Sequence, residues 1–380
     1  MILDYETLKL VWWLLIGVLL IGFVISDGFD MGACALLPFL GKTDEERRVI
    51  INTVGPHWDG NQVWFITAGG AIFAAWPAVY AAAFSGFYTA MLLVLFALFF
   101  RPVGFDYRSK IADPRWRRGW DWGLFIGGAV PALLFGVAFG NLLLGVPFQH
   151  DELLRPIYTG SFFGLLRPFA LLAGLVSLSM LIMHGAVWLQ LRAGPPVRER
   201  ARRVAVIAGG ILIISFALAG LWLALEIDGY RVVSQPALDA LPNPLAKSVQ
   251  VARGAWLGNY TAYPWMMLAP LSGFLGAGAT MLLVRVNRPA LAFFTSALSM
   301  SGVILTAGFS MFPFIMPSST VPVSSLTLWD ASSSQLTLTI MFWAAVIFVP
   351  IILAYTSWTY KSMWGPVTVE RIRATDHESY

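Results

Sequence analysis

The chain has 380 residues, of which 58% are hydrophobic and only 12% are charged. Soluble domains carry about 25% charged residues, so this composition excludes a soluble protein and indicates an integral membrane protein. The single cysteine, Cys34, excludes a disulfide within the chain and a cysteine-held zinc or iron–sulfur site.

Long apolar runs follow one another along the chain. Runs of about 20 residues can cross a hydrocarbon core of roughly 30 Å. The chain starts with acidic residues, whereas a secretory signal peptide starts with basic ones, so the first run is expected to be an uncleaved span with a periplasmic N-terminus. We predict an all-α membrane protein, one polytopic domain over 1–380 with nine transmembrane helices at about 8–40, 61–76, 80–100, 123–145, 165–191, 204–225, 263–284, 290–312 and 335–360.

The basic residues test this count, because cytoplasmic loops of membrane proteins carry an excess of lysine and arginine. With the N-terminus outside and nine spans, the inner segments hold most of the 25 lysine and arginine residues. One span more or fewer would disrupt this alternation, so the C-terminus is predicted to be cytoplasmic. The same rule accounts for the formal net charge of +4, and we expect no nucleic-acid partner.

Two carboxylates, Asp27 and Asp30, lie within the first run. In a helix their spacing of three puts both on one face, and two like charges in a low dielectric favour protonation of at least one. A functional or subunit-packing role is one interpretation. The other is an ordinary inner end of a span, where the acids are hydrated or paired with arginine.

The densest polar stretch stands at the start of the second run, on the predicted cytoplasmic side. Asp59 is expected in the first helical turn, where the helix dipole stabilises a carboxylate. A capping aspartate beside an interfacial Trp58 would account for those two residues, but not for His57, Asn61 and Gln62 beside them. Titratable and amide groups at a membrane mouth are typical of a proton or polar path.

A third polar group follows the run that ends at residue 100. Arg101 comes directly after two phenylalanines and is expected to reach a buried carboxylate such as Asp30 or Asp59. Arg108 and Lys110 are expected to be cytoplasmic anchors.

Asp121 lies between two tryptophans farther along the chain. We expect it to cap a helix or to belong to an interfacial belt.

Four histidines, His57, His150, His184 and His377, are too few and too scattered for haem pairs or a haem–copper centre. His184 is expected to be a packed, hydrogen-bonded residue. Phosphate-loop, serine-hydrolase and HExxH zinc motifs are absent from the sequence. The residues alone therefore indicate a polytopic transporter or a subunit of a membrane complex.

Several stretches resemble subunit II of the cytochrome bd quinol oxidases. They include Ser-Asp-Gly-Phe-Asp-Met-Gly in the first run and His-Trp-Asp-Gly-Asn-Gln-Val-Trp at the second. The resemblance spans the chain at 16–32, 56–64, 73–88, 99–110, 137–148, 307–319 and 326–338.

This resemblance implies a heterodimer with subunit I, in which two nine-helix halves are related by pseudosymmetry in the bacterial inner membrane. Subunit I would ligate two haems b and the haem d. The pair would oxidise ubiquinol or menaquinol, reduce dioxygen to water and take its protons from the cytoplasm, generating a proton motive force without pumping. Small single-span accessory subunits, lipid and a structural quinone in this chain are also implied.

The resemblance assigns roles to nine residues, none of them catalytic or metal-ligating. It places Asp59 on a proton path with His57 and Trp58 beside it, and Trp64 at an oxygen channel. At the inner face or the subunit contact it places Asp27, Asp30, Arg101, Asp106 and Lys110.

Two alternatives stay open. A secondary transporter is suggested by the polar interruption at 27–32, because transporters often contain broken helices at their binding sites. A scaffold that only steadies its partner would assemble in the same way but would not need Asp59.

Overall fold

The computed structural model describes residues 3–374 and residue 380. Eight helical segments in this part of the chain are long and apolar enough to cross a membrane, which confirms the all-α membrane fold. They are α1 (Tyr5–Leu40), α5 and α6 together (Tyr88–Leu98, Phe100–Tyr107), α7 (Pro114–Leu144), α8 (Pro168–Arg192), α9 (Val197–Leu225), α11 (Leu268–Arg285) with the 3₁₀ turn η3 (Pro264–Met267) before it, α12 (Pro289–Met311) and α14 (Gln335–Ser362).

The ninth span is a broken one. Helices α3 (Trp58–Ala75) and α4 (Pro77–Gly86) meet at an angle of 119°, and they make a ninth crossing if they count as one. Pro77 starts α4 and restricts the residue before it, and Trp76 accordingly leaves the helical region with φ −133° and ψ 67°. The predicted third run, 80–100, is therefore divided between α4 and α5.

Helix α1 is the central element of the fold and contacts α3, α7 and α8. Its N-terminus is capped by Asp4, whose carboxylate accepts a hydrogen bond from the Thr7 amide at 2.7 Å. The helix runs without a break through residues 27–32. The broken helix that a transporter site would require at this point is therefore absent.

Glycines allow α1 and α8 to touch through their backbones. A Cβ placed on Gly32 would lie 2.1 Å from the Leu181 carbonyl oxygen, and one on Gly185 would lie 2.5 Å from the Gly32 carbonyl carbon. Small residues at membrane helix contacts permit this approach. The contact fixes α1 against α8 and so fixes the position of the two aspartates on α1.

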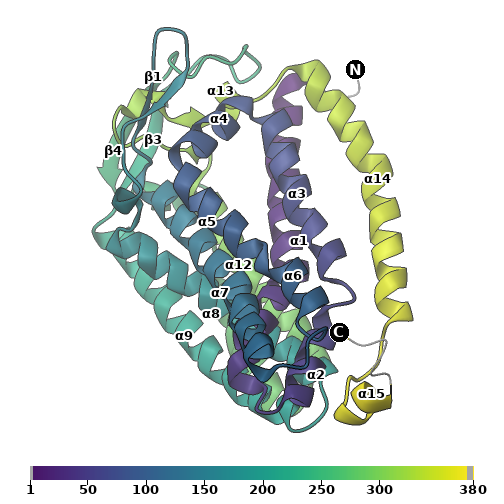
Figure 1. The fold of residues 1–380 in the computed structure, drawn as a ribbon. Coiled ribbons are helices and arrows are strands. Elements are labelled where there is room, and N and C mark those ends of the chain that lie inside the picture. The colour runs from purple at the N-terminus through teal and green to yellow at the C-terminus, as the bar shows by residue number, and fades with distance from the viewer. Residues whose placement is uncertain (1–2, 375–379) are drawn as a thin grey trace.

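The two ends of the bundle carry different structures (Figure 1). At one end lie the short helices α2 (Asp44–Val54) and α15 (Val369–Ala374). The other end carries three antiparallel strand pairs and short helical turns. These are β1 (Phe148–His150) with β2 (Pro156–Tyr158), β3 (Asp228–Ser234) with β4 (Ser248–Arg253), β5 (Phe314–Met316) with β6 (Leu326–Thr327), and η1 (Phe163–Leu165), η2 (Ala255–Leu257), α10 (Gly258–Ala262), η4 (Pro322–Ser324) and α13 (Leu328–Ala331).

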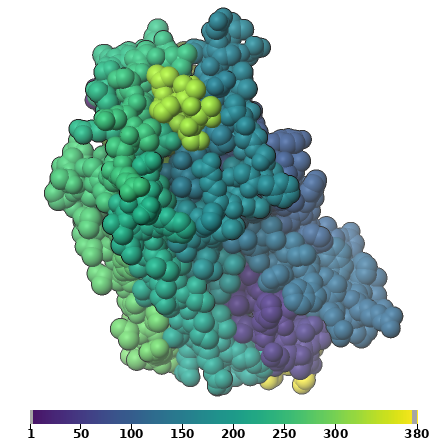
Figure 2. All heavy atoms as spheres, turned by 90° about the vertical axis from the view of Figure 1, so that its left-hand side faces the viewer, coloured from purple at the N-terminus to yellow at the C-terminus, as the bar shows by residue number. Residues whose placement is uncertain are grey.

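The strand end is one connected structure although its segments are far apart in the sequence. Figure 2 shows the loop near residue 320 between the region of β1 and β2 and the region of β3 and β4. The hydroxyls of Thr159 and Thr320 lie 3.0 Å apart. Lys9 of α1 donates hydrogen bonds from Nζ to the carbonyl oxygens of Leu238 and Trp329, both at 2.8 Å. The segment 228–262 is thereby held against α1.

Helix α14 stands apart from the rest of the bundle (Figure 1), where α1 and α3 are its principal neighbours. Only 6% of its most apolar 18-residue window is buried inside the chain, against 67% for α8. A span this exposed needs cover from lipid or from another protein.

Candidate functional site

The α2 end of the bundle holds a buried ion pair. Arg101 and Asp27 are 0% and 1% exposed, and Arg101 Nη1 donates to Asp27 Oδ2 at 2.9 Å. Arg101 Nη2 donates to the other oxygen of the same carboxylate, so the contact is bidentate. Arg101 was expected to meet Asp30 or Asp59. Asp30 is indeed within ion-pair distance, at 3.9 Å, but the hydrogen-bonded partner is Asp27, because the rotation of α1 turns Asp27 toward α6.

A chain of two hydrogen bonds ends at Asp30, the other aspartate of α1. Asn61 of α3 donates from Nδ2 to Asp30 Oδ2 at 2.8 Å, and the Tyr360 hydroxyl of α14 donates to Asn61 Oδ1 at 2.6 Å. Arg101 Nη2 lies 3.9 Å from Asp30 Oδ2. The two acids therefore share one buried site, which α1, α3, α6 and α14 build together.

Aromatic rings enclose this acid site. The Arg101 guanidinium lies over the Trp58 ring at 5.6 Å, and Trp58 packs on Phe105 with ring centroids 5.5 Å apart. The His57 ring meets Tyr360 edge to face at 4.8 Å. Burial, together with the nearby Arg192 charge, lowers the pKa of His57 to about 4. His57 is therefore a neutral imidazole at neutral pH.

Eight of the nine predicted site residues divide into two groups. Asp27, Asp30, Arg101, His57 and Trp58 come together in the interior, as described. The charged residues Asp59, Asp106 and Lys110 instead lie on the surface.

Trp64 lies farther along α3, half-buried against α1. A Cβ on Gly22 would come within 2.7 Å of its ring. Trp64 therefore belongs to the packed α1–α3 contact and not to the acid site.

Sequence reasoning did not find Tyr360. It lies in the last span, about 300 positions from Asn61, among other aromatic residues, so no local pattern distinguishes it. Asn61 was noticed only as a neighbour of Asp59, although its amide joins Tyr360 to Asp30. The signal that could have identified Asn61 is a polar residue one turn inside a membrane span.

Two expectations about nearby charges were wrong. Arg108 is buried and is not a surface anchor: its Nε donates to Asp121 Oδ1 at 2.6 Å and its Nη2 to Asp44 Oδ1 at 2.9 Å. Asp121 is buried too and also accepts from Arg47 Nη1 at 2.6 Å, so it neither caps a helix nor lies in a belt. These pairs fasten α2 to the start of α7.

The histidines do not converge on one point. His184 is a packed residue, as expected, with Ser296 Oγ 2.7 Å from Nδ1 and the Ile25 carbonyl oxygen 3.0 Å from Nε2. His150 lies in β1 at the strand end, and His377 lies outside the described residues. Within the described part of the chain, no three His, Cys, Asp or Glu side chains are grouped to hold a metal.

An apolar cavity of about 190 Å³ lies inside the bundle. Phe23 of α1, Phe65 of α3 and Phe216 of α9 contribute to its wall, together with residues of α7, α8 and α12. Its lining is nearly all hydrocarbon, so it suits an apolar molecule and not a charged one.

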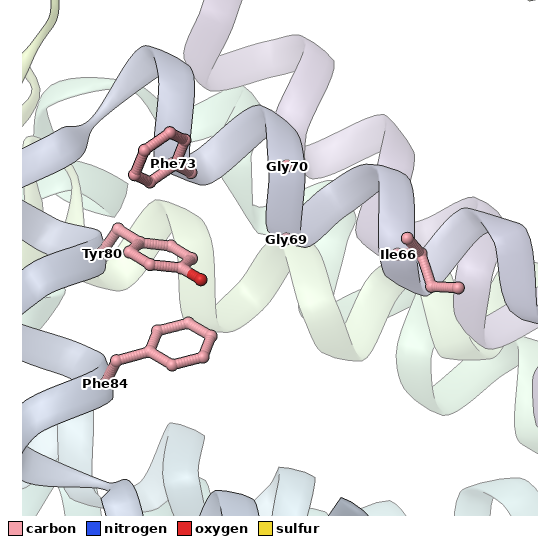
Figure 3. Close-up of a pocket in the computed structure, with 6 residues that line it drawn as sticks. All are labelled: Ile66, Gly69, Gly70, Phe73, Tyr80 and Phe84. Carbon is pink, nitrogen blue, oxygen red and sulfur yellow. The ribbon is translucent and has the colours of Figure 1, made fainter.

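A second hollow opens on the surface in the bend between α3 and α4. It encloses about 340 Å³ between Ile66, Phe73, Tyr80 and Phe84, with two glycines as its floor. Figure 3 shows the Tyr80 ring between Phe73 and Phe84, with its hydroxyl toward the open space. Ile66 is 67% exposed and Phe73 is 58% exposed.

The comparisons with known proteins agree with one another. The family model for cytochrome bd terminal oxidase subunit II matches residues 8–363. The chain is 57% identical over 378 residues to cytochrome bd-I ubiquinol oxidase subunit 2 of Escherichia coli K12, covering 100% of both chains. It is 56% identical to the probable cytochrome oxidase subunit 2 of Haemophilus influenzae, again covering 100% of both.

A solved structure shares the fold. It is a chain of the bd oxidase from Geobacillus thermodenitrificans, matched with a TM-score of 0.69 at 16% identity. The match covers 93% of this chain and 97% of that one.

Proposed function

The chain belongs to the cytochrome bd terminal oxidase subunit II family, and from this premise we propose that it is the second subunit of a quinol:oxygen oxidoreductase in the bacterial inner membrane. The complex takes electrons from ubiquinol or menaquinol and reduces dioxygen to water. This chain gives protons and oxygen access to a reaction that takes place in its partner.

The partner, subunit I, holds the two haems b and the haem d in this proposal. Haem iron is held by histidine, cysteine, methionine or tyrosine side chains, and a bis-histidine haem needs two histidines on facing helices. His184 has both nitrogens engaged, and His57 is enclosed by aromatic rings with no second histidine near it in the described chain. The two residues do not form the facing pair of a bis-histidine haem, so the proposal places the haems and the redox steps in subunit I.

The side of the molecule with α3, α4 and α14 is proposed to meet subunit I. Helix α14 leaves Ile340, Ile347 and Phe348 between 56% and 62% exposed, and the hollow at the α3–α4 bend is also open at the surface. Large exposed apolar areas are typical of protein contacts. Small single-span subunits and lipid cover other apolar faces in this proposal.

The proposed proton entry is at Asp59. Its carboxylate is exposed in the first turn of α3. Asn61, two residues farther along the same helix, is already buried and bonded to Asp30. The observation that carries the proposal is that this surface carboxylate lies in the same helical turn as Asn61, whose amide binds a buried acid. Asp106 supplies a further exposed carboxylate for collecting protons on this side, and Lys110 is an exposed cation near it in the sequence.

The apolar parts of the chain serve the apolar reactants in the same proposal. Trp64 lies at the entry of the oxygen route. The inner cavity lined by phenylalanines seats the structural quinone, because a nearly pure hydrocarbon wall favours a polyprenyl chain.

The test is an Asp59→Asn variant of the complex purified with subunit I. We expect slower oxygen consumption per haem with an unchanged haem spectrum. The matched control is Glu199→Gln, since Glu199 is also an exposed acid in the first turn of an inner-side span. Wild-type turnover by a fully assembled Asp59→Asn complex would leave only a scaffold role.

The broken helix at 27–32 that suggested a secondary transporter is not present, because α1 is continuous. Solute uptake by the chain alone in liposomes would revive it.

A further inference from the structure

The two acids of α1 are one helical turn apart but have unlike surroundings. Both oxygens of Asp27 accept hydrogen bonds from Arg101. Asp30 receives one hydrogen bond, from Asn61 to Oδ2, and its Oδ1 is buried without a hydrogen-bond partner among the described residues. Arg101 Nη2, at 3.9 Å, is too far to donate to Asp30.

The charges in the site do not balance if both acids are ionised. Within the described chain, Arg101 is the one cation at ion-pair distance from either carboxylate. The other groups facing Asp30 or electrostatically coupled to it are the Asn61 amide, the Tyr360 phenol and the Cys34 thiol, which carry no positive charge. An unpaired carboxylate in a dry interior is costly, and binding a proton removes that cost.

We propose that Asp30 is the proton-carrying carboxyl of this subunit, with its proton on Oδ1, and that Asp27 is the fixed ionic partner of Arg101. The assignment deepens the proposed function and rests on it, since it names the buried group that a proton entering on the α2 side reaches. An O–H bond forms at Oδ1 and breaks again. The proton comes from the inner aqueous phase, and oxygen reduction consumes it.

Asn61 and Tyr360 are positioning residues for this carboxyl. The Tyr360 hydroxyl donates to Asn61 Oδ1, which fixes the amide so that its NH₂ group faces Asp30. The NH₂ group then occupies Asp30 Oδ2 and leaves Oδ1 for the proton. Tyr360 belongs to α14, so the position of this loosely held helix sets the geometry of the acid.

The experiment is infrared spectroscopy of the purified complex in the carbonyl-stretching region of protonated carboxylic acids, in H₂O and in D₂O. We expect a band that shifts in D₂O and is lost in Asp30→Asn. The band moves in Asn61→Ala and in Tyr360→Phe, because both variants change the hydrogen bond to Asp30. It stays in place in Gln62→Ala, the control on the same helical turn, because Gln62 has no part in the chain of hydrogen bonds.

Turnover provides the second measurement. An Asp30→Asn complex with normal haem spectra is expected to lose most of its oxygen consumption. Identical infrared spectra for wild type and Asp30→Asn would overturn the proposal, as would full turnover of that variant. If Asp30→Asn does not assemble, an unmoved band in Asn61→Ala overturns it instead.

The two proposals fail in different ways. Normal turnover of Asp59→Asn with the Asp30 band present removes the entry route and keeps the protonated acid. Slow turnover of Asp59→Asn without an Asp30 band keeps the entry route and removes the protonated acid.

Discussion

Replacing Asp27 by asparagine breaks the buried ion pair with Arg101 and leaves the Asp30 hydrogen bond in place. The change leaves the Arg101 guanidinium in the interior without its bidentate partner, and both side chains are at most 1% exposed. Breaking a buried pair by removing one partner costs about 3–5 kcal/mol. Asp30 lies close enough to take part of the charge, at 3.9 Å from Arg101 Nη2, so we expect the lower end, about 3 kcal/mol.

The assay is denaturant titration of the purified complex, which gives the free energy of unfolding. Asp30→Asn provides the comparison: it leaves the Asp27–Arg101 pair intact and weakens one hydrogen bond, which costs about 1 kcal/mol. The double variant Asp27→Asn with Arg101→Met removes both charges, and we expect it to lose less stability than the sum of the two single changes. Equal losses for Asp27→Asn and Asp30→Asn, or an additive double variant, would refute the division of roles between the two acids.

Two further predictions concern the packing around the site. His57 has a folded-state pKa of about 4, against an unfolded value of about 6.5, so below pH 6.5 the unfolded chain binds a proton that the folded chain does not. Stability is therefore expected to fall by roughly 3 kcal/mol between pH 6.5 and pH 4 on account of this group, and the same pH titration of His57→Phe should lack that part of the loss. Gly32→Ala would place a methyl group 2.1 Å from the Leu181 carbonyl oxygen and is expected to lower the melting temperature of the complex. Its control, Gly69→Ala, meets open space and should melt as wild type does.

The sequence was sufficient for the class of fold, because the apolar runs and the alternation of basic loops are strong one-dimensional signals. It did not foresee the bend at Trp76. A proline one residue later is compatible with a loop between two straight spans as well as with a broken one. The outcome depends on what the ends pack against: the Ala75 carbonyl oxygen accepts from the Ser333 amide, which comes from the far end of the chain.

The acid site was predicted in composition but not in pairing. Asp27, Asp30 and Arg101 were all named from the sequence, yet Arg101 binds Asp27, because the rotation of one helix about its axis decides which acid faces α6. Contacts between helices distant in sequence, such as Tyr360 with Asn61, leave no local trace. Arg108 was misjudged for the same reason, since its partner Asp44 belongs to a short helix that the hydropathy pattern did not mark.

The central claim is that this chain brings protons to a reaction that takes place in subunit I. Its most direct test is a single turnover of the complex in lipid vesicles, with proton uptake on the inner side followed by a pH indicator beside the haem signals. We predict that Asp59→Asn slows proton uptake and oxygen reduction together, while Glu199→Gln matches the wild type. Proton uptake at the wild-type rate in the Asp59→Asn complex would contradict the account.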